Sequence, residues 1–164
     1  MADARRYAEG TDVSAERSRA ELETLLRKHG AKEFAVYTSD ERTICMYRLA
    51  GAMVRHVVEY PADLESFQKR NALGTPLLKR EQLVKAAESE WRRRWRALVL
   101  VCKAKLEIVA SGGSTFEREF MADMVLADGS SVAQALLPRL KQMYETGTMP
   151  DFPRLLLGPG GDHG

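Results

Sequence analysis

The amino-acid sequence predicts a single α+β domain with an N-terminal helix, a three-stranded antiparallel β-meander, a long amphipathic helix and two shorter C-terminal helices. Three apolar segments of strand length follow one another, joined by connections short enough for hairpins. A long run with helical periodicity comes next. A chain of 164 residues buries one substantial core. We therefore assign residues 1–150 to one domain, with 1–13 as a flexible arm and 151–164 as a Pro/Gly-rich tail.

The first helix is expected over residues 15–29, because both of its ends carry helix signals. Ser14 is a suitable N-cap. Arg27 and Lys28 place positive charge in the last turn, where it stabilises the helix dipole, and Gly30 suits a left-handed C-cap.

The strands are expected over residues 33–38, 43–49 and 53–60. Asp40 and Gly51 stand in the connections, where a positive φ is needed. Arg48 and Arg55 alternate with apolar residues, a pattern typical of a sheet with one half-solvated face. A helix must then cover the other face, because three strands alone are barely stable.

The long helix is expected to start at Thr75 and Pro76 and to end near Ala110, a length of about 50 Å. Its apolar positions share one arc: Val84, Ala87, Trp91, Trp95, Leu98, Cys102, Leu106 and Val109. Residues 97–102 are apolar all round, which indicates a turn enclosed by the sheet or by a partner chain. Strands of about 20–27 Å cannot cover the whole helix, so we expect a homo-oligomer.

Two shorter helices are expected after the glycines that end the long one. Ser114 and Glu117 have the spacing of a capping box that opens the first of them. Ser130 or Ser131 caps the second, which runs to about residue 146 and contains Pro138.

The distribution of charge indicates one segment of the chain, rather than the whole protein, as a candidate binding surface for a polyanion. The chain has 25 basic and 23 acidic residues, which gives no support to a polyanion-binding character overall. Residues 61–110, however, hold eleven basic and six acidic residues. We therefore predict a non-enzymatic nucleic-acid-binding protein that uses a basic face of the long helix. The expected phosphate contacts are Arg92, Arg93, Arg96, Lys103 and Lys85, and further positive charge in the same segment comes from Lys69, Arg70, Lys79 and Arg80.

Two alternatives stay open at this point. In the first, the arginines form a solvated, salt-bridged face, and the arc that Trp91 and Trp95 share with Leu98 favours core positions for both tryptophans over stacking on bases. Arg94 and Lys105 fall inside the apolar arc, so each needs an acidic partner, a reach to solvent or a ligand. The second hypothesis is therefore an oligomer that binds a host protein or sequesters a small anionic nucleotide through these two residues.

The residues give little indication of catalysis or metal binding. Cys45 and Cys102 lie in apolar runs, as free buried thiols do, without the spacing of a zinc site. We consider two further sites: a catalytic pair of His56 and Cys45, and a divalent-ion site at Glu119 and Asp123. For both sets of residues the sequence favours a structural role. We expect no cofactor and no enzyme. Without a signal peptide or a run of about 20 apolar residues, we expect a cytoplasmic protein with no membrane partner.

Three stretches resemble a family of small uncharacterised proteins from bacteriophages and prophages. They are residues 7–11 with 16–23, residues 95–107 and residues 128–147. The resemblance implies a phage gene product in the host cytoplasm, and anti-defence and DNA-metabolism roles are typical of such proteins. It carries no activity and no residue roles.

Overall fold

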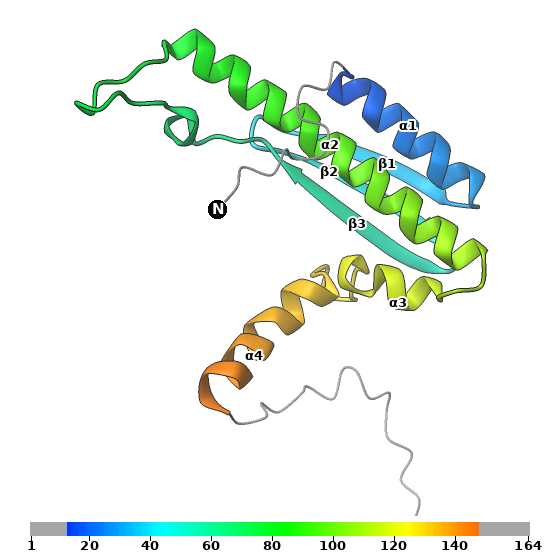
Figure 1. Ribbon diagram of the computed structural model, residues 1–164. Coiled ribbons are helices and arrows are strands. Elements are labelled where there is room, and N and C mark those ends of the chain that lie inside the picture. The colour runs from blue at the N-terminus through cyan, green and yellow to red at the C-terminus, as the bar shows by residue number, and fades with distance from the viewer. Residues whose placement is uncertain (1–12, 148–164) are drawn as a thin grey trace, which may run out of the picture.

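The computed structural model describes residues 13–147, in which two helices lie across one face of a three-stranded sheet (Figure 1). This arrangement confirms the predicted α+β class. In chain order the elements are α1 (Ala15–Lys28), β1 (Lys32–Thr38), β2 (Arg42–Leu49), β3 (Ala52–Glu59), η1 (Leu64–Phe67), α2 (Arg80–Ala110), α3 (Phe116–Phe120), η2 (Met121–Asp123) and α4 (Val132–Thr146). The proposed arm over 1–13 lies almost wholly outside the described residues, and the tail over 151–164 lies wholly outside them.

Helix α1 has the ends that the sequence indicates. The Ser14 hydroxyl accepts a hydrogen bond from the backbone N–H of Arg17, which satisfies one of the free donors of the first turn. After the last turn, Gly30 adopts a φ of 89°, in the left-handed region.

The sheet is an antiparallel meander with strand order β1-β2-β3, as expected. The turn between β2 and β3 has positive φ at both Ala50 and Gly51, while Asp40 in the first connection does not take up that conformation. A bulge near Glu33 interrupts the register between β1 and β2.

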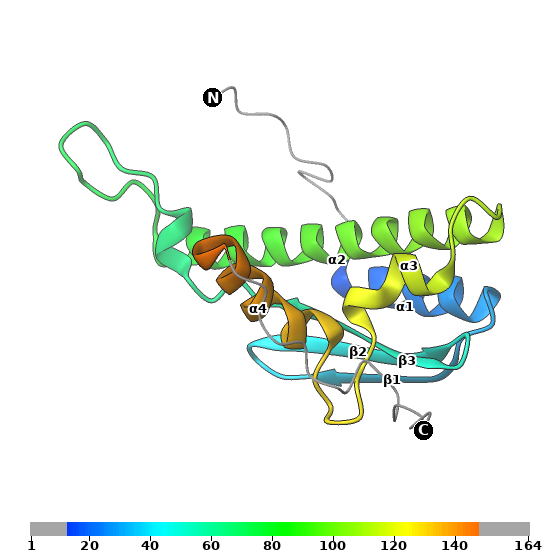
Figure 2. The same cartoon turned by 90° about the horizontal axis from the view of Figure 1, so that it is seen from below.

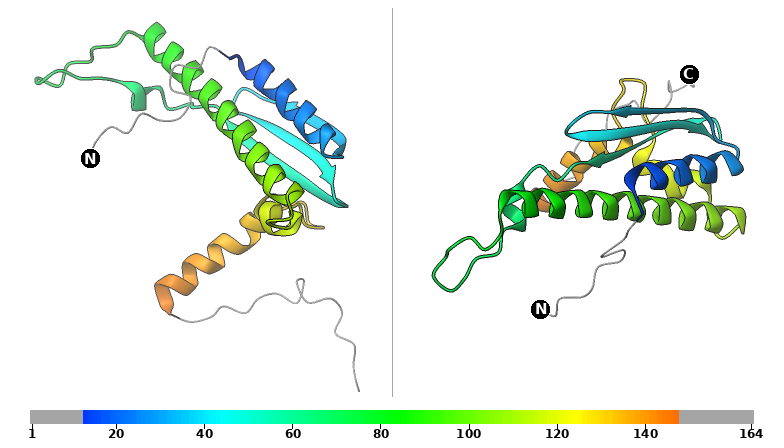
Figure 3. Two further views of the ribbon diagram at one scale, coloured as in Figure 1. Left: turned by 45° about the vertical axis from the view of Figure 1, so that its right-hand side comes forward. Right: turned by 90° about the horizontal axis from the view of Figure 1, so that it is seen from above.

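Alternation along β2 separates a buried face from a more open one. Thr43, Cys45, Tyr47 and Leu49 are buried. Helices α1 and α2 lie over this buried face, and they also pack against each other (Figure 2). Among the described residues no helix covers the opposite face, as the view from above also makes clear (Figure 3).

Helix α2 begins at Arg80, so the expected start at Pro76 is wrong. Residues 75–78 pair with the chain before them instead: the N–H of Leu77 donates to the carbonyl of Lys69, and Pro76 bridges to Arg70. This pairing with residues 69–71 outweighs the helix signal of Thr75 and Pro76. The buried stripe of α2 is close to the predicted arc and consists of Leu83, Ala87, Trp95, Val99, Cys102 and Leu106.

Within the described chain, residues 97–102 are not enclosed all round, because Val101 is 49% exposed, and enclosure by a partner chain stays a prediction. The first turns of α2 extend beyond the sheet, and η1 packs against the helix. The part of α2 that the sheet does not reach is therefore covered in part by η1 of the same chain. The homo-oligomer stays a prediction.

The C-terminal helices differ in how firmly they are held. Thr115, rather than Ser114, caps α3, and Ser114 donates to Glu119 instead, so the expected capping box with Glu117 is wrong. Ser131 caps α4 in a capping box with Gln134, and α4 continues through Pro138. Helix α4 projects away from the sheet (Figure 1), and its single buried residue is Val132, which is 9% exposed.

Candidate functional site

The arginine run of α2 is largely neutralised inside the protein. The Nε and Nη2 atoms of Arg93 donate to the two carboxylate oxygens of Glu90 at 2.7 and 2.5 Å. Arg94 also donates to Glu90, at 3.3 Å, and to the backbone carbonyl of Glu59 at 2.8 Å. Two of the predicted contacts with a ligand are therefore already occupied.

Arg96 is also neutralised inside the protein, because α1 packs against this part of α2. Arg96 forms an ion pair with Glu21 of α1. The Nε atom of Arg92 is buried and has no hydrogen-bond partner among the described residues. Of the five predicted phosphate contacts, Lys85 and Lys103 are exposed and have no ion pair within residues 13–147.

Glu90 is the acidic centre of this group. Hydrogen bonds from Arg93, followed by those from Arg94 and the charges of both, hold the pKa of Glu90 below its usual 4.5 despite burial. The folded state therefore holds fewer protons than the unfolded state in acid. This contribution to stability is fully present above pH 4.5 and is lost as the pH falls through the folded pKa.

We expect the Glu90→Gln variant to flatten the acid side of the stability profile. In urea unfolding from about pH 7 to about pH 3, the wild-type midpoint should fall more steeply below pH 4.5 than the variant midpoint. Glu88→Gln is the matched control, because Glu88 is exposed and makes no ion pair with a described residue. Parallel profiles for wild type and Glu90→Gln would contradict the assignment.

A projecting loop over residues 68–79 joins η1 to α2 and extends away from the sheet (Figure 1). Its two limbs are held together by pairing. The side chain of Gln68 bonds both the N–H and the carbonyl of Leu78, at 2.9 and 3.1 Å, and the N–H of Leu77 donates to Lys69 at 2.8 Å. The loop is therefore an organised structure, with Leu73 at its tip 90% exposed.

Basic side chains gather on this loop and on the first turns of α2. Residues 68–85 hold five basic residues and one acidic residue. Four of the basic side chains are exposed and have no ion pair within the described part of the chain, and we call them the basic cluster: Lys69, Lys79, Arg80 and Lys85. Glu81 stands four residues before Lys85 on α2, but the two side chains form no ion pair within 4 Å. Arg70 is paired with Glu65 at 3.3 Å.

A buried polar network lies on the other side of α2, between the helix and β3. The Nε2 atom of His56 lies 2.8 Å from the hydroxyl of Tyr47 and 3.6 Å from the sulfur of Cys102. Its Nδ1 atom lies 3.6 Å from Asp123. Lys105 approaches the other oxygen of Asp123 at 3.4 Å. Lys105 therefore has the acidic partner that its position on the apolar arc requires.

This network has the residue types of a Cys–His–Asp arrangement, but its burial opposes nucleophilic chemistry. Cys102 and Cys45 are fully buried, and burial raises the pKa of the Cys102 thiol to about 12 and that of Cys45 to about 11. Burial on its own would raise the pKa of Asp123. The hydrogen bond and charge of His56, together with those of Lys105, outweigh this effect, so the pKa of Asp123 is lower than its usual value. We interpret the network as a structural link between η2, β3 and α2.

The expected minor sites are not brought together. Cys45 lies directly opposite His56 across the β2–β3 pair, but the sulfur that approaches the imidazole belongs to Cys102. Glu119 accepts a hydrogen bond from Ser114, whereas Asp123 faces His56. Within residues 13–147, no group of three or more His, Cys, Asp or Glu side chains is arranged to hold a metal ion.

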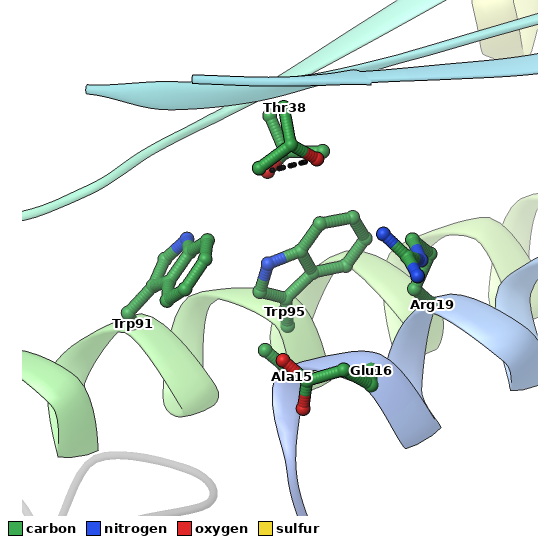
Figure 4. Close-up of a pocket in the computed structure, with 7 residues that line it drawn as sticks. Ala15, Glu16, Arg19, Thr38, Trp91 and Trp95 are labelled. Carbon is green, nitrogen blue, oxygen red and sulfur yellow. Dashed lines mark hydrogen bonds between the residues drawn. The ribbon is translucent and has the colours of Figure 1, made fainter. Parts of the chain in front are cut away.

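A small cavity of about 50 Å³ lies between α1, α2 and the sheet, beside Trp95 (Figure 4). Trp91, Arg19, Thr38 and Thr43 also line it. The indole nitrogen of Trp95 points toward Trp91, and neither indole N–H has a hydrogen-bond partner among the described residues. Because Trp95 is 1% exposed, it is a core residue and is not free to stack on a base.

No family model, curated protein or solved structure matches this chain. The comparisons therefore leave the resemblance to phage proteins as a prediction. Within the described range, no helix has the length and apolar character that crossing a membrane requires.

Proposed function

We propose that this protein binds nucleic acid through the projecting loop and the first turns of α2. The observation that carries the proposal is the basic cluster: four exposed cations without an ion pair among the described residues, on the loop and the helix end that extend beyond the sheet. Cations that are unpaired within the protein are free to replace the counterions of a phosphate backbone.

The position of the cluster at a helix N-terminus strengthens the proposal. Lys79 and Arg80 flank the first turn of a 31-residue helix, where the helix dipole is also positive. Cations are unfavourable there in the free protein, and a bound phosphate would relieve that repulsion. Of the five predicted contacts, the proposal keeps Lys85 and leaves out the arginines and Lys103, which lies in the distal half of α2. It adds Lys69, Lys79 and Arg80, which the sequence also placed in the basic segment.

The second hypothesis, an oligomer that binds a host protein or a small anionic nucleotide through Arg94 and Lys105, has less support. Both residues hold internal acidic partners, Glu90 and Asp123. The phage origin and the non-enzymatic character stay predictions.

The test is the salt dependence of binding. Fluorescence anisotropy with a labelled DNA duplex, its single strand and an RNA of the same sequence should detect binding that weakens steeply with salt. For about four phosphate contacts, the duplex affinity should fall about a hundredfold between about 50 and about 200 mM salt. Binding without this slope, or no binding to any of the three by a folded protein, would contradict the proposal. The mass in solution, measured alongside, tests the predicted homo-oligomer.

A further inference from the structure

We propose that the tip of the projecting loop is an apolar wedge, which inserts Leu73 between bases at a step where they are unpaired or easily unstacked. The inference rests on the proposed function, because it assigns a preferred ligand to the same surface. The ligand is a nucleic acid duplex with a local interruption, such as a mismatch.

The first argument is the rigidity with which the tip presents Leu73. The side-chain oxygen of Asn71 accepts hydrogen bonds from the N–H groups of Leu73 and Thr75, at 3.0 and 2.9 Å. The backbone of Asn71 also bonds Gly74 and Thr75, at 2.9 and 3.1 Å. Gly74 takes a φ of 79°, which suits glycine in this tight turn. The tip is therefore ordered before any ligand binds, which lowers the entropic cost of using it.

The second argument is the combination of exposure and surrounding charge. Leu73 is 90% exposed and, in this structure, contributes nothing to the core. The cations of the basic cluster lie behind it, on the limbs of the loop and the first turns of α2. An aliphatic side chain ahead of phosphate-binding cations is the arrangement with which proteins unstack a base step.

A single exposed leucine with cations behind it favours a nucleic acid over a lipid surface as the ligand. A single leucine at a narrow tip gives too little apolar area to hold a protein at a bilayer, where interfacial helices bury a whole apolar face. A base step accepts one side chain of this size. Unstacking is least costly where the base pair is already disrupted, which is why the wedge favours an interrupted duplex.

The test compares a DNA duplex that carries 2-aminopurine beside a single mismatch with the fully paired duplex of the same sequence. The wild type should bind the mismatched duplex about tenfold more tightly, since it buries Leu73 there, and should raise the 2-aminopurine fluorescence. Leu73→Ala should lose both effects while it keeps the salt slope and the affinity for the paired duplex. Leu77→Ala is the matched control: Leu77 is 56% exposed on the limb of the same loop, and this variant should keep the preference.

The outcomes separate the inference from the function on which it rests. Salt-dependent binding with no preference for the mismatch, or a preference that survives in Leu73→Ala, overturns the wedge and leaves the proposed function standing. Absence of binding to either duplex overturns the wedge; absence of binding to the single strand and the RNA as well overturns the proposed function. Leu73-dependent sedimentation with vesicles of phosphatidylserine and phosphatidylcholine, without binding to DNA or RNA, would assign the tip to a membrane surface and overturns both.

Discussion

Neutralising the basic cluster should abolish most of the affinity for nucleic acid and leave the fold intact. The variant replaces four residues with glutamine: Lys69, Lys79, Arg80 and Lys85. With about four phosphate contacts removed, the slope of log affinity against log salt should decrease in magnitude by about 3–4, and the affinity at low salt should fall about a hundredfold or more. The thermal midpoint should stay the same or rise slightly, because Lys79 and Arg80 oppose the dipole of α2.

A charge-matched control separates this effect from a loss of net charge. It replaces four other exposed basic residues that have no ion pair within the described chain: Arg17, Lys28, Lys103 and Arg118. The control should retain most of the slope and affinity. An equal loss in both variants would contradict the assignment to the cluster. A loss traced to Lys103 alone would return the contact surface to the distal half of α2, as the sequence first indicated.

Replacing Trp95 with alanine should have the largest effect on stability of any substitution in α2. Trp95 is 1% exposed and packs between the sheet and α1, next to a cavity of about 50 Å³ that the truncation would enlarge. Large-to-small changes of this kind cost about 3–5 kcal/mol, which is a large part of the total for a domain of this size. Urea unfolding followed by far-UV circular dichroism measures the loss.

Trp91→Ala is the internal comparison. Trp91 is half-buried and forms a T-shaped contact with the Tyr60 ring at a centroid distance of 5.2 Å, so its removal should cost markedly less. A larger loss for Trp91 than for Trp95 would contradict the packing described here. Trp95→Phe should leave nucleic-acid affinity unchanged, because this side chain lies in the core.

The parts of the fold that local signals encode could be predicted from the sequence. The cap at Ser14, the left-handed Gly30 and the alternation along β2 all depend on neighbours within a few residues. The start of α2 could not be predicted, because Thr75 and Pro76 carry a helix signal that pairing with residues 69–71 overrides. That pairing becomes visible only in three dimensions.

The candidate site could likewise be predicted only as far as it depends on residues close together in the sequence. The sequence located the basic segment, but the partners that decide which cations are free lie on other elements. Arg96 is neutralised by Glu21, 75 residues away, and Lys105 by Asp123, 18 residues away. An arginine run on an amphipathic helix therefore indicates a concentration of positive charge. Whether those arginines are free to bind a ligand depends on the acidic side chains that pack beside them.

The loose attachment of α4 has a consequence for the molecule's local dynamics. The one buried residue of α4, Val132, lies in its first turn, and the hydrogen bonds from Arg55 to Gly129 and Gln134 hold the same end. Releasing the later turns exposes little apolar area, so they open at a lower free energy than the amides of α2 that cover the core. Backbone amides near Tyr144 therefore exchange with solvent well before global unfolding, and this helix forms a cooperative unit separate from the sheet and its two covering helices.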